Sequence, residues 1–447
     1  MNLHDMNLPE GAMTVFNTLT DNGFECYMVG GVVRDLLLGE RPSDYDFTTN
    51  AKPEDVVNLF DKVLLTGVKH GTVTVVVDGN SFEVTTYRVE GNYSDSRHPD
   101  YVSFSDTLEE DLSRRDFTIN AIACDSKGRI VDPFSGLADL KNRLVECVGD
   151  PDERFNEDPL RMLRAIRFSS KLGFDIESDT FLSIKRNCSN VKTVSKERVC
   201  SELTKTLMTD NPGYGVLKLY ETGLLQELLP EVAAMFTCEH NNKYHYTDVG
   251  RHSVDVLNGC PKDKNLRWAA LLHDTGKLSC RAHKPDGSCS YHGHQEKSYE
   301  VAMRVCDDLR FSNKDKSEVC KLVLLHDTYH SRIVKVRRFV AENGMEFIEK
   351  LHRLQIADAK AHSSAFVEQL LSEKEEFYSK CRMCHEDGSA MVVGDLQVDG
   401  NDLLNLGYSG KKIGEMLNEL LKRCIENPEL NRRDYLMSVA LRYSKKN

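Results

Sequence analysis

The sequence predicts an α+β protein in which a mixed α/β head is followed by helical modules. Short β-branched and apolar runs alternate with turns through the first third of the 447 residues. After residue 150, helical periodicity takes over and strand patterns largely end. Because one hydrophobic core rarely serves a chain of this length, we expect several domains. They are a head at 1–150, a helical neck and body at 151–245, a histidine-rich helical module at 246–362 and a helical tail at 363–447.

Four strands and two helices are expected in the head. Apolar and β-branched runs at 26–29, 45–48, 72–77 and 82–87 are the strand candidates. The runs 15–22 and 53–60 have helical patterns, and we expect both helices to pack on the sheet. Polar and turn-forming residues crowd the stretch 91–101, which therefore predicts a loop.

The rest of the chain is expected to be helical. In the neck, helical periodicity covers 158–172, 196–208 and 213–223. A histidine-rich helical segment covers 246–358, a charged helix follows at 366–384, and a last helical unit covers 394–443. Any catalytic site in the head therefore precedes a long helical body in the sequence.

Composition favours a cytoplasmic protein with no membrane anchor. Asp and Glu number 70 against 58 Lys and Arg, and the net charge of −12 disfavours a non-specific coat for nucleic acid. Local basic clusters still leave RNA binding open. No apolar run is long enough to cross a bilayer, and residues 1–13 have no signal-peptide pattern. The fourteen cysteines have no framework spacing and are expected to be reduced thiols.

Two carboxylates in the head predict a magnesium site. A strand that runs into Gly30 and Gly31 and then opens a helix lets backbone N–H groups approach a phosphate, and Arg34 adds a cation. Asp44 and Asp46 stand two apart in an expected strand, so both face one side. Such a pair repels unless a cation lies between, and Mg²⁺ shares oxygen ligands of this kind with substrate phosphates. A solvated turn is the alternative for an isolated pair.

Together these motifs resemble a known superfamily. The run from Gly30 to Asp35, followed by Asp44 and Asp46, resembles the head of the DNA polymerase β nucleotidyltransferases. More narrowly, the chain resembles the class II tRNA nucleotidyltransferases and their bacterial poly(A) polymerase relatives. The narrower resemblance is carried by residues 114–121, by 132–134 with Gly136 and Asp139, and by 157–161. It covers roughly the first half of the chain and returns at the C-terminal end, where 400–403 and 413–421 resemble the tail that holds the tRNA elbow.

The resemblance implies template-independent addition and repair of the 3′-terminal CCA of tRNA from CTP and ATP, with release of pyrophosphate. Asp44 and Asp46 would hold Mg²⁺ as the catalytic pair. The implied nucleotide-binding residues are Gly31, Arg34, Arg115, Asp158, Arg161, Arg164 and Arg167. The expected partners are the tRNA 3′ end, ATP and CTP, with no membrane and no protein partner.

Asp158 and Arg161 have a physical rationale for choosing the base. One helical turn apart, they can present their side chains together. A carboxylate accepts a hydrogen bond from an exocyclic amine, and a guanidinium donates to a ring nitrogen or carbonyl. Cytosine and adenine offer that order of groups, whereas uracil and guanine reverse it and would leave buried groups unpaired. A surface ion pair is the alternative interpretation of this spacing.

Several alternatives stay open within the head. The loop 91–101 resembles the flexible loop of full CCA-adding enzymes, and 66–73 departs from the signature of bacterial poly(A) polymerases. A poly(A) polymerase or an enzyme that adds only C remains the same-class rival. Glu83 is either a third catalytic carboxylate or a solvent-facing strand residue.

Histidines in the helical part resemble the metal centre of an HD domain. The resemblance is carried by His252, by His273 with Asp274, and by Asp358. His294 and His326 would extend the centre toward two ions. Imidazoles and carboxylates hold divalent ions that activate water against phosphoesters, so the resemblance implies a second divalent metal and a phosphohydrolase activity. A degenerate scaffold is the alternative, and the rivals of another class are an HD phosphohydrolase with an RNA-binding head and an inactive RNA-binding protein.

Overall fold

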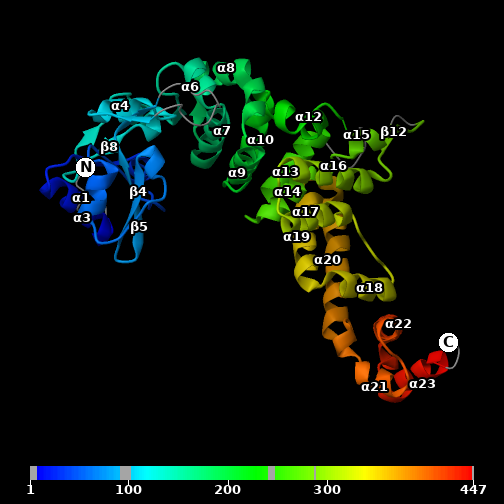
Figure 1. Ribbon diagram of the computed structural model, residues 1–447. Coiled ribbons are helices and arrows are strands. Elements are labelled where there is room, and N and C mark those ends of the chain that lie inside the picture. The colour runs from blue at the N-terminus through cyan, green and yellow to red at the C-terminus, as the bar shows by residue number, and fades with distance from the viewer. Residues whose placement is uncertain (1–7, 91–101, 240–246, 286–287, 445–447) are drawn as a thin grey trace. The chain divides into compact units, whose positions relative to one another are not determined.

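The computed structural model describes residues 8–90, 102–239, 247–285 and 288–444 (Figure 1). The chain divides into two compact units, Met1–Pro230 and Glu231–Asn447. The first contains the mixed α/β head and a helical continuation, and the second is almost entirely helical. The predicted α+β class, with a head followed by helical modules, is confirmed. In the part of the chain described, no helix is both long and apolar enough to cross a membrane.

A seven-stranded mixed sheet forms the head, in the order β3-β4-β5-β2-β1-β8-β9. Its strands are β1 (Cys26–Val29), β2 (Asp46–Thr49), β3 (Val63–Leu64), β4 (Thr72–Val77), β5 (Asn80–Thr86), β8 (Ala123–Cys124) and β9 (Ile130–Val131). The β2–β5 pair is parallel, and the other neighbours are antiparallel. All four expected strands are present, with ends within two residues of the prediction.

Helices pack on this sheet through aromatic contacts. The head contains α1 (Glu10–Asp21), α2 (Gly31–Leu37), α3 (Pro53–Leu59), α4 (Leu108–Ser113) and α5 (Gly136–Asn142), with 3₁₀ turns η2 (Val68–His70) and η3 (Thr118–Asn120). Phe16 of α1 meets Phe47 of β2 edge to face, with ring centres 5.0 Å apart. The expected helix 15–22 begins earlier, at Glu10, because Gly11 allows the first turn to lie directly on Phe82.

A small ribbon flanks the expected loop. It consists of β6 (Arg88–Glu90) and β7 (Val102–Phe104), which pair antiparallel. The loop expected at 91–101 lies outside the described residues.

The helical continuation of the first unit contains the segment expected to select the base. Its helices are α6 (Pro151–Glu157), α7 (Leu160–Leu172), α8 (Ser178–Asn187), α9 (Lys196–Leu207), α10 (Pro212–Glu221) and α11 (Leu224–Leu228), with η4 (Cys188–Thr193) and the parallel pair β10 (Leu144–Val145) and β11 (Asp175–Ile176). The expected helix 158–172 was placed too early, because Asp158 is extended and ends α6. Pro159 has no N–H to continue the first helix, so α7 starts at Leu160.

The second unit is built from helices and one short hairpin. Its elements are α12 (Pro230–Met235, which spans the division), α13 (Val249–Gly259), α14 (Lys264–Leu272), α15 (Lys277–Cys280), β12 (Ala282–His283), β13 (Cys289–Ser290), α16 (His294–Asp308), α17 (Asn313–Leu325), α18 (Ile333–Asn343), α19 (Met345–Lys360), α20 (Ser364–Glu386), η5 (Val393–Asp395), α21 (Gly400–Asn405), α22 (Lys411–Glu426), η6 (Pro428–Leu430) and α23 (Arg433–Ser444). Trp268 of α14 is fully buried, and Leu403, Leu420 and Leu436 centre a separate core in the tail.

Gly136 provides a test of how tightly the head is packed. A Cβ atom at this position would overlap the backbone carbonyl of Thr118. Gly136→Ala is therefore expected to lower the free energy of unfolding by about 2 kcal/mol, because the backbone has to move. Chemical denaturation of the full chain measures the change. Gly414→Ala, with no atom within 4 Å of the new methyl group, is the control and should not destabilise the protein; equal losses in both variants would contradict the packing argument.

Candidate active site and metal centre

A cavity of about 410 Å³ lies where the strands of the head meet α7. Gly30, with φ of 78°, turns β1 into α2, a conformation that favours glycine. The lining includes Gly31, Arg34, Asp44, Asp46, Arg115, Arg164 and Arg167, which are seven of the nine residues expected at the nucleotide site; Asp158 and Arg161 are not among its described lining residues. It also includes Asn120, Phe168 and Lys171, which were not among them.

Three carboxylates gather at one side of the sheet. Asp46 of β2 is the register partner of Glu83 in the parallel strand β5, so both side chains point to the same face. Asp44 lines the cavity with Asp46. Glu83 is exposed and lies beside Asp46, so its position leaves both alternatives for this residue open. Burial, together with Glu83 and Asp44, raises the pKa of Asp46 to about 6 although Arg115 opposes the shift. A divalent cation would relieve this repulsion, so the donor set fits Mg²⁺.

The cations of the cavity are held by acidic partners. Arg34 is buried and donates to Asp35 at 2.8 Å and to Asn120 at 2.6 Å. Arg115 donates to Asp111 at 3.2 Å. Each guanidinium is therefore oriented by the head before any phosphate enters.

Two arginines of α7 are anchored in the same way. Arg164 donates to Asp116 at 2.7 Å, and Arg167 donates to Glu202 at 2.6 Å. Burial would raise the pKa of Asp116, but Arg164 and a hydrogen bond from Asn120 lower it to about 2. The Asp116–Arg164 pair is therefore ionised at neutral pH.

Asp158 and Arg161, which were expected to select the base, have partners that the sequence did not indicate. Asp158 accepts hydrogen bonds from both terminal nitrogens of Arg198, at 2.6 and 3.3 Å. Arg161 donates to Glu157 at 2.5 Å and to the backbone carbonyl of Arg114 at 3.1 Å. Arg198 is forty residues from Asp158, and no local pattern could have revealed it.

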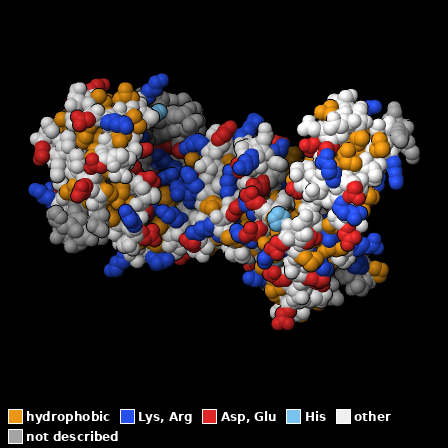
Figure 2. Space-filling model, turned by 90° about the horizontal axis from the view of Figure 1, so that it is seen from below, with side chains coloured by type: hydrophobic (Ala, Val, Ile, Leu, Met, Phe, Trp, Pro, Cys, Tyr) orange, Lys and Arg blue, Asp and Glu red, His pale blue; other side chains and the backbone are white. Residues whose placement is uncertain are grey.

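Lys and Arg side chains gather in a hollow at the left of Figure 2. The cavity of the head has a cationic lining, to which Arg34, Arg115, Arg164, Arg167 and Lys171 contribute. The hollow in Figure 2 is consistent with that lining. Positive charge is therefore concentrated on this face although the net charge of the whole chain is −12.

The histidine-rich module brings its expected ligands together. His252 of α13 lies 3.0 Å from Asp358 of α19, and His273 lies 3.2 Å from Asp274. Asp274 is shared, since its other oxygen lies 3.5 Å from His294 and 3.9 Å from His326. All six residues are nearly inaccessible to solvent. Five of them form two groups of possible ligands that meet at Asp274, namely His252 and His273 on one side and His294 and His326 on the other.

Unsatisfied atoms indicate that this cluster accommodates cations. His273 Nε2 and Asp274 Oδ1 are buried and have no hydrogen-bond partner. Leaving such atoms unpaired is costly, and a divalent ion would satisfy both. Burial lowers the pKa of His326 to about 4, which keeps its imidazole neutral as a ligand must be.

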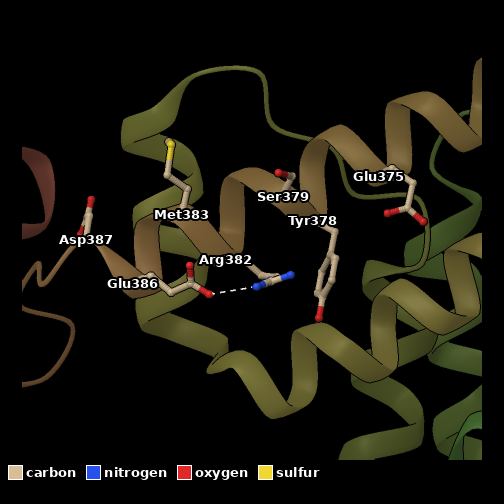
Figure 3. A pocket seen from close by; sticks show the side chains of 7 residues that line it. All are labelled: Glu375, Tyr378, Ser379, Arg382, Met383, Glu386 and Asp387. Atoms are coloured by element: carbon tan, nitrogen blue, oxygen red, sulfur yellow. Dashed lines mark hydrogen bonds and ion pairs between the residues drawn. The ribbon is translucent and has the colours of Figure 1, made fainter.

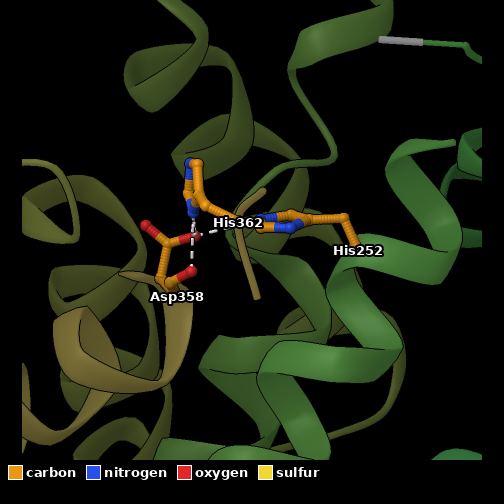
Figure 4. Close-up of side chains that lie close together, drawn as sticks. All are labelled: His252, Asp358 and His362. Carbon is orange, nitrogen blue, oxygen red and sulfur yellow. Dashed lines mark hydrogen bonds and ion pairs between the residues drawn. The ribbon is translucent and has the colours of Figure 1, made fainter. Parts of the chain in front are cut away.

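His362 belongs to the same neighbourhood, although it was not among the ligands expected from the sequence. Its ring centre lies 5.1 Å from that of His252, and its Nδ1 lies 2.7 Å from the backbone oxygen of Asp358 (Figure 4). With His252 and Asp358 it forms a third group of possible ligands. A signal for it in the sequence was its position four residues after Asp358, although it lies just beyond the end of α19 at Lys360.

A second pocket, of about 610 Å³, runs along the C-terminal half of α20 (Figure 3). Tyr378 and Arg382 line it, and Arg382 forms an ion pair with Glu386 at 3.2 Å. None of the site residues expected from the sequence belongs to its described lining.

Three family models match successive parts of the chain. The "Poly A polymerase head domain" matches residues 26–146, the "Probable RNA and SrmB- binding site of polymerase A" matches 173–236, and the "HD domain" matches 224–362. Nucleotidyltransferase and HD domains both imply dependence on divalent metal.

Curated relatives include CCA-adding enzymes of lactobacilli. That of Lactobacillus helveticus is 54% identical over 194 residues, which are 43% of this chain and 49% of that protein. That of Levilactobacillus brevis is 45% identical over 267 residues, which are 60% of this chain and 64% of that protein. The chain therefore spans about half to two thirds of the length of these relatives.

Solved structures match over nearly the whole chain. The CCA-adding enzyme of Bacillus stearothermophilus in complex with CTP matches with a TM-score of 0.72 and 28% identity, over 97% of both chains. The Thermotoga maritima CCA-adding enzyme complexed with tRNA has the same fold, with a TM-score of 0.57 at 20% identity over 99% of this chain and 98% of that one.

Neutralising Asp46 is expected to stabilise the metal-free protein at pH 7.5. A carboxyl whose folded pKa is raised contributes most stability at low pH and loses it as the pH rises through about 6. Asp46→Asn should thus raise the free energy of unfolding at pH 7.5 by on the order of 2 kcal/mol. At pH 5, between the usual aspartate pKa and the raised one, the difference should fall to about half, because the carboxyl is still ionised in the unfolded state but mostly protonated in the folded state. Chemical denaturation in the presence of a chelator measures the free energy of unfolding of the variant and of the natural protein at each pH. An equal difference between the two proteins at both pH values would contradict the raised pKa of Asp46.

Metal analysis tests the shared carboxylate of the histidine cluster. With manganese supplied, mass spectrometry of the desalted protein should find about two ions per chain beyond those of the head. Asp274→Asn should remove both, because both ligand groups contain Asp274. His326→Ala should remove about one, since His326 belongs to a single group. Identical losses in the two variants would contradict a pair of adjacent sites.

Proposed function

We propose that this chain, which belongs to the family of CCA-adding enzymes and bacterial poly(A) polymerases with an HD domain, adds and repairs the 3′-terminal CCA of tRNA. The substrates are CTP, ATP and tRNA, and pyrophosphate is the second product. The observation that carries the proposal is the single cavity in which Asp44 and Asp46 face Arg34, Arg115 and the arginines of α7.

The carboxylates would hold the metal, and the arginines would bind the triphosphate. Asp44 and Asp46, with Glu83 beside them, would hold Mg²⁺, which supplies charge stabilisation when bound. The 3′-hydroxyl of the tRNA attacks the α-phosphorus, and the α–β phosphoanhydride bond breaks. Arg34 and Arg115 stabilise the negative charge that accumulates on the leaving pyrophosphate.

Base choice is assigned to the junction of α6 and α7. Asp158 would accept from the exocyclic amine of C or A, and Arg161 would donate to the adjacent ring nitrogen. Arg198 keeps Asp158 in one orientation through two hydrogen bonds. An oriented carboxylate loses less entropy on binding the base, which sharpens discrimination against U and G.

The domain boundaries at 150, 245 and 362 complete the proposal. The head and neck hold the nucleotide, and the tail at 363–447 binds the body of the tRNA. A cytoplasmic location follows from the substrates. The CCA-adding enzyme of Bacillus stearothermophilus forms a complex with CTP, and its likeness to this chain supports a CTP site here.

A second function is proposed for the histidine cluster. Two adjacent divalent ions, joined by Asp274, would activate water for phosphoester hydrolysis. The supporting observation is the pair of unsatisfied buried atoms on His273 and Asp274. Lys277 lies 2.6 Å from Asp274 and supplies a cation for the phosphate of a substrate.

Nucleotide addition to shortened tRNA transcripts tests the first function. Transcripts that end before each of the three terminal nucleotides are incubated with each NTP in turn. Addition of C, C and A followed by arrest is expected. Asp44→Ala/Asp46→Ala should reduce the rate by at least about 10³-fold, because the metal ligands are lost.

Other outcomes separate the rivals. Unlimited addition of A alone would identify a poly(A) polymerase, and arrest after two C would identify an enzyme that adds only C. If no nucleotide is added, the first function is wrong. Hydrolysis of a nitrophenyl phosphoester by the natural protein and by Asp274→Asn then tests the histidine cluster separately.

A further inference from the structure

Phe168 occupies an unusual place among the arginines of the head cavity. Three guanidinium groups surround its ring, with carbon atoms 4.2 Å (Arg167), 5.0 Å (Arg34) and 5.3 Å (Arg164) from the ring centre. Arg34 comes from α2, whereas the other two precede Phe168 on α7. A single aromatic ring thus connects cations from two separate elements.

The contact has a physical role because the three cations repel one another. The face of an aromatic ring carries negative charge density and attracts a guanidinium within about 6 Å, more strongly where water is excluded. Each guanidinium also has an acidic partner, Asp35, Asp116 or Glu202. Each carboxylate holds one edge of its guanidinium group, and the ring of Phe168 restrains the same guanidinium from a second side.

The ring itself is immobilised. Phe117, which is fully buried, meets it edge to face, with ring centres 5.8 Å apart. Phe168 is only 5% exposed although it lines the cavity. So little exposed area leaves the ring poorly placed to stack on a nucleobase.

We infer that Phe168 is a positioning residue, which holds Arg34, Arg164 and Arg167 in the arrangement that binds the triphosphate of the incoming nucleotide. The inference rests on the proposed nucleotidyl transfer and adds a residue that touches the arginines and not the reacting atoms. Because the arginines are oriented in advance, less entropy is lost when the triphosphate binds.

The matched experiment removes one ring at a time. Phe168→Leu removes the ring and keeps an apolar side chain, and Phe168→Tyr keeps the ring. Phe174→Leu is the control, since Phe174 is 2% exposed, has Arg143 5.1 Å from its ring centre and does not belong to the cavity lining. Phe168→Met replaces Phe168→Leu if the latter does not fold.

Three quantities are measured on each full-length variant. They are kcat and KM for CTP, KM for tRNA, and the Kd of magnesium tripolyphosphate by calorimetry. Phe168→Leu should raise the KM for CTP and the Kd of tripolyphosphate by about tenfold and leave the KM for tRNA unchanged. Phe168→Tyr should restore both values, and Phe174→Leu should alter neither.

Two results would overturn the inference. If the KM for CTP rises and tripolyphosphate binds as before, Phe168 acts on the nucleoside. If Phe168→Leu and Phe174→Leu change all the measured quantities to the same extent, the ring of Phe168 contributes only to packing. Tripolyphosphate binding does not require turnover, so it tests Phe168 even if the natural protein adds no nucleotide and the proposed function fails.

Discussion

The ion pair between Asp116 and Arg164 joins α7 to the head, and the arrangement of the candidate site depends on it. Asp116 also accepts from Asn120, which in turn accepts from Arg34. A chain of hydrogen bonds therefore runs from α7 through the turn η3 to α2. Asp116 is buried whereas the Arg164 side chain is 34% exposed, so loss of Arg164 would leave a buried carboxylate without its cation and destabilise the first unit. The geometry of the cavity is consequently inseparable from the stability of the first unit.

Both candidate sites concentrate ionisable groups away from water. In the head, Asp46 lies beside other carboxylates, and its pKa is raised to about 6. The negative charge of Asp46 therefore costs free energy in the absence of a cation, and a bound divalent ion would recover that cost. In the second unit, His273 and Lys277 hold the pKa of Asp274 well below its usual range, so the protein itself already compensates that charge.

Strands β1, β2, β4 and β5 could be predicted because each one alternates or concentrates apolar residues over four to seven positions, whereas β3, β8 and β9 have only two residues each and were not predicted. Asp44 and Asp46 line one cavity, but the strand alternation expected for them was wrong, because β2 begins at Asp46 and Asp44 lies in a bend before it. The helix expected from residue 158 shows where this reasoning ends. The predicted helix is present from Leu160 onward, but the backbone is extended at Asp158 and a new helix starts after Pro159. This interruption between α6 and α7 places Asp158 next to Arg198.

Residue type and short spacing were enough to predict the fold class, and they also singled out the two aspartates, the arginines of the head cavity and six candidate ligands in the histidine cluster. Only the tertiary structure decided which partners those residues have. It paired Asp158 with Arg198, Arg167 with Glu202 and His362 with the metal cluster, and it placed Phe168 among three guanidiniums. Such contacts join elements that are distant along the chain, and they form because packing brings buried charges to the nearest group that can compensate them.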